Sequence, residues 1–251
     1  MAHRDTSLFV SERLQYLEKC RLAFLELPFL DDAEMQGAPN LSIAAFETPK
    51  LRRCPFNLAS VNWRSKSTSA LGGGLDGFVW KVSFGDDGPY ALKVFWDKDP
   101  PEFPHYFALQ RECQNMALLQ RMEAAVTRAA EESRPIQVKA NPRTRDEALA
   151  NTFAFADENS QSESSTGALE GDGDTVTIHS MPRMKKCFGW LRFDGQLIQQ
   201  MPLKVRPPVL CVNKIRRAMS NKQDYIALVY EYVEEDENPP ELWRRRPTSL
   251  A

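Results

Sequence analysis

Three glycines, a lysine and a glutamate are the residues of this chain whose types and spacing could do chemistry. Gly72, Gly74 and Gly77 fit the pattern G-x-G-x-x-G, in which glycines let the backbone come close to phosphate oxygens. Lys93 lies inside an apolar run, where its ammonium group must reach water, find an anion or lose its charge. Pairing with Glu112 would satisfy both charges and leave the ammonium directed at phosphates. Snorkelling to water remains the alternative for Lys93 taken alone.

The context of the glycine loop separates its alternatives. The pattern alone also fits a glycine-rich turn that binds nothing. A Rossmann fingerprint opens a helix, and a P-loop ends in Gly-Lys-Ser/Thr before a helix. Here the loop leads into residues 78–84, where apolar side chains alternate as in a half-buried strand. A glycine loop that opens a strand is the arrangement of protein kinases.

Strand and helix patterns would position these residues. Residues 86–89 predict a turn, and residues 90–96 predict the strand that carries Lys93. A helix is expected after Pro104, with Glu112 at the margin of its apolar face. Further along, residues 187–198 predict a hairpin that turns at Asp194-Gly195, and residues 225–230 a wholly apolar last strand.

The remaining segments set the expected domain organisation. Residues 1–69 predict an N-terminal helix (6–27) followed by an irregular connector. Residues 70–238 would form one domain, interrupted by a disordered insertion at about 156–180, where Ser, Glu, Asp and Gly dominate. Residues 239–251 form a charged tail.

Together these features resemble the ATP-binding lobe of a protein kinase. The resemblance implies an α+β fold: an antiparallel sheet of about five strands with one helix of the αC type. Lys93 and Glu112 then stand for the ion pair between strand three and that helix, and Tyr230 for the gatekeeper. The residues implied to bind nucleotide are Gly72, Gly74, Gly77, Val79, Ala91, Lys93, Glu112 and the hinge backbone of Glu231 and Val233.

A narrower resemblance is to the fungal Fta-two-like subunits of the Sim-four kinetochore complex. It is carried by residues 90–96, by Arg111-Glu112-Cys113 and by residues 145–157. It implies a role in a kinetochore complex, protein partners and a nuclear location.

The catalytic parts of a kinase are not evident after the hinge. Phosphoryl transfer needs a catalytic-loop Asp, an Asn for metal and a D-F-G Asp for Mg²⁺. The three histidines, His3, His105 and His179, all precede the hinge, and Phe193-Asp194-Gly195 precedes it too and fits a turn. We therefore expect no catalytic residue and no metal site, with ATP the one cofactor left open and Mg²⁺ not expected without a second lobe.

Three hypotheses for the function follow. The favoured one is a catalytically incomplete, kinase-like domain that binds partner proteins and could retain weak ATP binding. The second is the ATP-binding half of an active kinase whose catalytic lobe is missing from this chain. The third is a kinetochore structural subunit that binds no nucleotide.

Composition excludes several other classes. Apolar residues make up 42% and the net charge is −2, so nothing implies that the chain as a whole binds polyanions. Apolar runs are too short for a membrane span, no secretion signal is evident, and the five scattered cysteines suggest reduced thiols in an intracellular protein. Residues 196–223 are basic, which fits a nucleic-acid or nuclear-import patch but favours a solvated loop.

Overall fold

A seven-stranded mixed sheet forms the centre of the protein, in the order β1-β2-β8-β11-β5-β4-β3. The computed structural model describes residues 5–102, 106–160 and 174–234. The sheet strands are β1 (Leu30–Glu34), β2 (Leu51–Arg53), β3 (Ser69–Gly73), β4 (Gly77–Phe84), β5 (Asp87–Phe95), β8 (Cys187–Asp194) and β11 (Asp224–Glu231). From β8 to β3 all neighbours are antiparallel, whereas β1 with β2 and β2 with β8 are parallel. The α+β class is confirmed, and the sheet is larger and more mixed than expected.

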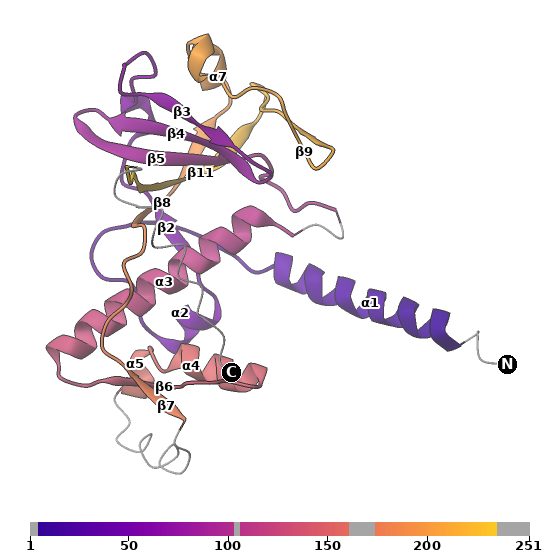
Figure 1. Ribbon diagram of the computed structural model, residues 1–251, viewed down its shortest axis with the longest axis vertical. Helices are drawn as coiled ribbons and strands as arrows, with labels where there is room; N and C mark the ends of the chain where they lie inside the picture. Colours follow the sequence, from indigo (N-terminus) through magenta and orange to yellow (C-terminus); the bar gives the residue numbers. More distant parts are fainter. Residues whose placement is uncertain (1–4, 103–105, 161–173, 235–251) are drawn as a thin grey trace, which may run out of the picture.

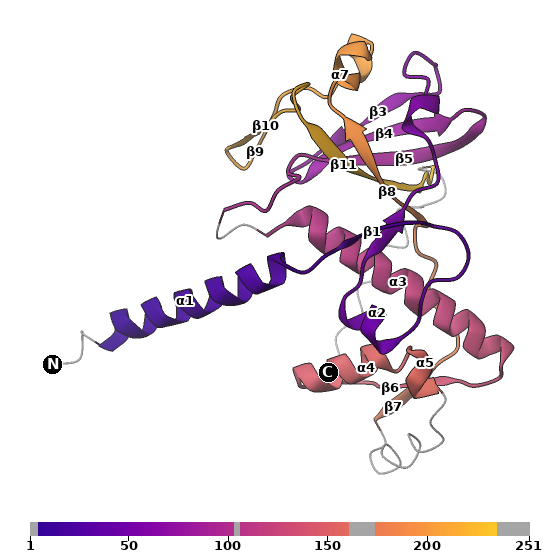
Figure 2. The same cartoon turned by 180° about the vertical axis from the view of Figure 1, so that it is seen from behind.

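α3 lies beneath this sheet, α2, α4, α5 and β6–β7 lie beyond α3, and α7 and β9 lie at the opposite end of the molecule (Figures 1 and 2). The α-helices are α1 (Asp5–Leu25), α2 (Ile43–Glu47), α3 (Ala108–Glu131), α4 (Arg145–Phe153), α5 (Asp157–Ser160) and α7 (Leu197–Gln200), and the 3-10 turns are η1 (Leu58–Ser60) and η3 (Leu203–Val205). The small sheets pair β6 (Ile136–Lys139) with β7 (Thr175–Ile178), and β9 (Leu210–Val212) with β10 (Ile215–Arg217). Among the described residues, no helix is both long enough and apolar enough to cross a bilayer.

Side-chain alternation divides the sheet into two buried faces. In β4 and β5, Trp80, Val82 and Leu92 are fully buried in the larger core cluster. The next residues along the strands point the other way. Phe95 and Leu228 therefore pack with α3 in a second cluster. Lys93 shares this second face, so the fold aims it at α3.

The prediction that residues 31–69 form an irregular connector is wrong. It contains β1, α2, β2 and η1, and it supplies buried side chains to the core, with Leu51 fully buried and Val61 and Trp63 nearly so. Strands of three to five residues carry too few positions for a visible alternation. The parallel pairing of β1 with β2 and of β2 with β8 is set by tertiary contacts rather than by local pattern.

The hairpin predicted over residues 187–198 is also wrong. β8 is a strand, but after Asp194 the chain enters α7, and β8 pairs with β11 instead. The turn predicted at residues 86–89 lies slightly earlier, because Phe84 pairs with Asp87 and the chain reverses between them.

The expected disordered insertion, residues 156–180, is ordered at both ends. Ala156 is fully buried in a third core cluster with Phe155, Ile136 and Phe46, α5 follows it, and β7 precedes residue 180. The middle of that stretch, residues 161–173, lies outside the described residues, as does the predicted charged tail, residues 239–251.

The predicted N-terminal helix is confirmed as α1, which projects away from the body in both views (Figures 1 and 2). Its C-terminal part is anchored, in part by the Arg21 guanidinium, which donates to the Pro101 carbonyl oxygen. Leu25 packs against the second core cluster, and the Gln110 side-chain amide of α3 donates to the carbonyl oxygens of Phe24 (2.8 Å) and Leu27 (3.1 Å). Leu14 and Tyr16, nearer the helix start, are exposed.

Candidate functional site

Glu112 of α3 binds two neighbouring strands at once. Lys93 of β5 lies 2.5 Å from one carboxylate oxygen, and the hydroxyl of Tyr230 on β11 donates to the other at 2.6 Å. Burial, followed by the neighbouring Cys187 and Glu112, raises the pKa of the Tyr230 hydroxyl. The phenol therefore stays protonated and serves as a donor. The predicted Lys93–Glu112 pair is present, and its side chains are about a quarter exposed (23% and 26%).

The sheet register gathers further predicted residues around Lys93. Val79 lies directly opposite Lys93, and Ala91 lies directly opposite Tyr230. Directly opposed residues share one face of a sheet. Val79, Ala91 and Lys93 thus line the α3 side of the sheet, and each is only half-buried. The resemblance to the kinase lobe implied that these residues would lie together and contact a nucleotide.

The glycine loop is a tight hairpin end. Gly72 has a φ of +137°, a conformation that favours glycine, and the Gly74 N–H donates to the Gly77 carbonyl at 2.9 Å. A Cβ on Gly77 would lie 2.4 Å from the Val94 carbonyl oxygen, whereas one on Gly74 would meet nothing within 4 Å. At Gly77 the requirement for glycine thus comes from close approach to the backbone of β5.

Side chains that the sequence pattern did not single out hold this loop in place. The Trp96 indole N–H donates to the Gly74 carbonyl at 2.9 Å, and the Trp96 backbone N–H donates to the Asp76 carbonyl at 3.1 Å. The Tyr106 hydroxyl donates to the Asp76 carboxylate at 2.9 Å, and the Arg111 guanidinium lies over the Tyr106 ring. Trp96 follows directly on a strand, and a buried indole N–H needs a hydrogen-bond acceptor. This was the one signal in the sequence that could have pointed to its role in holding the loop.

Of the predicted hinge residues, Glu231 is the last residue of β11, and Val233 follows two residues later. The Glu231 N–H donates to the Lys186 carbonyl at 2.8 Å, and the Glu231 carboxylate pairs with Arg183. Val233 is half-buried. Beside the face that carries Ala91, the Lys81 ammonium lies 4.1 Å from the centre of the Tyr232 ring.

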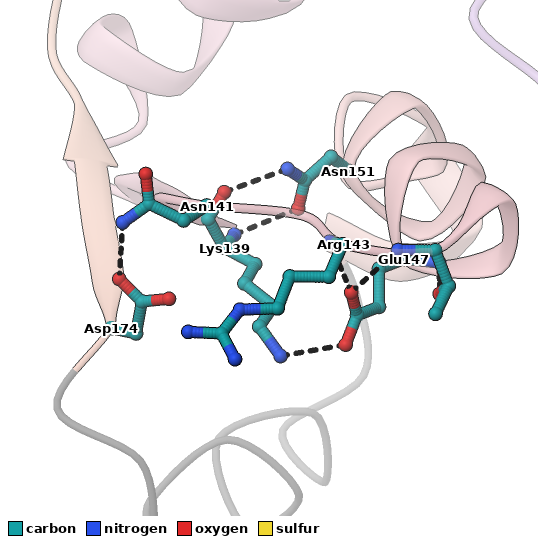
Figure 3. Close-up of polar contacts among 7 residues, drawn as sticks. Lys139, Asn141, Arg143, Glu147, Asn151 and Asp174 are labelled. Carbon is teal, nitrogen blue, oxygen red and sulfur yellow. Dashed lines mark hydrogen bonds and ion pairs between the residues drawn. The ribbon is translucent and has the colours of Figure 1, made fainter.

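A second polar cluster ties α4 to the small β6–β7 sheet (Figure 3). Lys139 pairs with Glu147 at 2.7 Å, and Glu147 completes a capping box with Thr144 at the start of α4. The Asn151 side chain exchanges two hydrogen bonds with the Lys139 backbone, at 2.7 and 2.8 Å. The Lys139 contact, followed by the N–H groups of Arg143 and Thr144, lowers the pKa of Glu147 to about 2. Each group is satisfied within the cluster, so it positions α4 rather than a ligand.

The cysteines divide by burial. Cys20 and Cys211 are exposed, and Cys54, Cys113 and Cys187 are buried free thiols. Burial raises the pKa of Cys54 to about 11 and that of Cys187 to about 12, which suppresses thiolate formation. Within the described residues, no group of three or more His, Cys, Asp or Glu is placed to hold a metal ion.

Comparison of the chain with protein-family models, with curated proteins and with solved structures found no match.

Proposed function

We propose that residues 69–231 form a lobe of the protein-kinase ATP-binding type that acts as a binding module. The strand order supports it. Five strands, β3, β4, β5, β11 and β8, are antiparallel neighbours, and the long helix α3 follows the third of them. The position of the lysine on that third strand and of the glutamate on the next helix is the kinase arrangement.

The contact between Lys93 and Glu112 is the observation that carries the proposal. In kinases this ion pair must be formed for the lysine to hold the nucleotide phosphates. The pair in this chain is formed, half-buried and bordered by Val79 and Ala91. Weak binding of ATP at this face is therefore part of the proposal, with Lys93 as the phosphate contact.

The test is a titration with a fluorescent ATP analogue, with and without Mg²⁺. We expect a dissociation constant of the order of 100 μM for the wild type. Lys93→Ala should weaken binding at least about fivefold, whereas Lys66→Ala, which changes an exposed lysine before β3, should leave it unchanged. Equal affinities of wild type and Lys93→Ala would remove the phosphate role of Lys93.

A scaffold that binds no nucleotide is the second candidate, and two contacts favour it. Trp96 ties the carbonyl groups of the glycine loop to the end of β5, and Tyr232 stacks on Lys81 beside Ala91. No binding by wild type in the same titration would select this candidate. Transfer of labelled γ-phosphate to the chain or to an added protein, lost in Lys93→Ala, would instead select the active-kinase alternative. The kinetochore role stays a prediction.

A further inference from the structure

Residues 195–223 form an unusually long connection between two paired strands. Asp194 of β8 and Asp224 of β11 are direct partners, so these strand ends lie side by side. Two residues suffice to join such antiparallel strands. Most connections within compact domains are only about four to six residues long. This segment, called the basic loop below, contains α7, β9 and β10. It lies at the end of the molecule that carries β3 and β4 (Figures 1 and 2).

The basic loop is firmly attached to the body. Met201 and Val205 are buried in the larger core cluster, and the Trp80 indole donates to the Val205 carbonyl at 2.7 Å. Arg217 of β10 donates to both carboxylate oxygens of Asp97 at 2.9 Å. The loop therefore presents its remaining side chains on a fixed surface.

All charged residues of the basic loop are cationic. Arg217 is neutralised by Asp97, and Arg206 donates to the carbonyl groups of Met201 and Gln199. The other cations are exposed and, within the described part of the chain, their side chains make no ion pair or hydrogen bond: Lys204, Lys214, Arg216 and Lys222. Such a surface attracts anionic partners.

Two aliphatic side chains of the basic loop are exposed as well. Leu203 is 82% exposed and Val209 is 58% exposed. The backbone of a nucleic-acid duplex would engage the cations and leave these aliphatic groups uncovered. Single strands stack on aromatic rings, and the basic loop contains no aromatic residue. A polypeptide that carries both carboxylates and aliphatic groups matches both features of the surface.

We propose that the basic loop docks an acidic segment of a partner protein in which carboxylates are interspersed with aliphatic side chains. The carboxylates face Lys204, Lys214 and Arg216, and the aliphatic groups cover Leu203 and Val209. This inference rests on the proposed binding role and assigns it a surface and a class of partner. The contacts between carboxylates and these exposed cations are screened by salt, so binding weakens as the salt concentration rises.

The experiment is a selection of displayed random peptides on the full wild-type chain, followed by fluorescence anisotropy with an enriched peptide. We expect the enriched sequences to combine Asp or Glu with Leu, Ile or Val. The triple variant Lys204→Glu, Lys214→Glu, Arg216→Glu should bind at least about tenfold more weakly at about 100 mM NaCl. Leu203→Ser should weaken binding about threefold without changing the salt dependence. Arg64→Glu with Lys66→Glu, which reverses two exposed cations outside the loop, is the matched control and should stay within about twofold.

Thermal melting of each variant checks that the fold is intact, which is expected because the changed side chains are exposed. Three results would overturn the proposal: no enrichment of acidic peptides, equal binding by the triple variant, or tighter binding of a DNA duplex of about 20 base pairs than of any peptide. Equal binding of an enriched peptide by the triple variant would move the docking surface elsewhere and leave the binding role itself standing. The nucleotide titration on Lys93 is independent of all three.

Discussion

Glu112 adds two polar contacts to the apolar packing of α3 against the sheet. Its carboxylate receives a charge-assisted bond from Lys93 and a hydrogen bond from Tyr230, so each oxygen is satisfied by a different strand. Loss of one partner of a buried pair leaves the other charge uncompensated, which costs more than the pair itself contributes.

Glu112→Gln should lower the free energy of unfolding by about 3 kcal/mol, because the Lys93 ammonium then lacks an anion. Tyr230→Phe, which keeps the ion pair, should cost about 1.5 kcal/mol for one lost hydrogen bond. Urea denaturation of both variants measures the difference. Equal losses in the two variants would show that the charge of Glu112 contributes nothing beyond its hydrogen bond to Tyr230.

Glu147 gives the structure a dependence on acid pH. Its pKa is lowered from 4.5 to about 2, chiefly by Lys139, so its contribution is complete above about pH 4.5 and is lost as pH falls toward 2. Carboxyl chemical shifts followed by NMR should place its midpoint near pH 2. In Lys139→Met the midpoint should rise toward 4.5, and an unchanged midpoint would remove Lys139 as the cause.

At the scale of the elements, the close packing of β4 on β5 leaves no room for a side chain at Gly77, whereas Gly74 has open space around it. Gly77→Ala places a Cβ 2.4 Å from the Val94 carbonyl oxygen, which is backbone and cannot rotate away. We expect this change to lower stability by more than about 2 kcal/mol. Gly74→Ala, with open space around it, should change stability by less than about 0.5 kcal/mol. Thermal unfolding of the pair measures the contrast, and similar melting temperatures would contradict the hairpin geometry.

Elements with a strong local pattern were predictable, and elements that depend on distant partners were not. The alternation in β4, the apolar run of β11 and the spacing in α3 identified those elements and aimed Lys93 at Glu112. β1 and β2 are too short for a pattern, and their parallel pairing is decided by contacts far apart in sequence. Asp194-Gly195 was recognisable as a turn, but the partner of β8 begins only at Asp224.

The same limit applies to the candidate site. Lys93 and Glu112 stood out as charges within apolar patterns, and their pairing could be inferred from that alone. The roles of Trp96 and Tyr230 depend on which carbonyl and which carboxylate the fold brings near them. Composition suggested disorder up to residue 180, although the β-branched residues of β7 were a signal for a strand.

The whole molecule combines two core clusters around the sheet with a third beyond α3, built on Phe46, Val126, Ile136 and Phe155. Apart from α3, the elements that contribute to the third cluster are short, and α4 contacts β6, where Lys139 pairs with Glu147. Units with few buried contacts open more easily than central strands. We expect this part of the molecule to unfold locally before the sheet does.

Hydrogen exchange followed by mass spectrometry tests this expectation. Amides of β6, β7 and α4 should exchange well before those of β8 and β11. Phe155→Ala should speed exchange in the first group by about tenfold or more and leave β11 unchanged. Uniform acceleration across all strands would instead indicate that the three clusters unfold as one unit.

The anchoring of α1 has a consequence for distance. Leu25, the Arg21 contact with the Pro101 carbonyl and the Phe24 carbonyl held by Gln110 fix the last turns of the helix, and the rest of its 21 residues run away from the body. At 1.5 Å per residue the helix is about 30 Å long. α1 therefore behaves as a spacer mounted on α3: a small tilt at Gln110 is magnified into a displacement of many ångströms at its start.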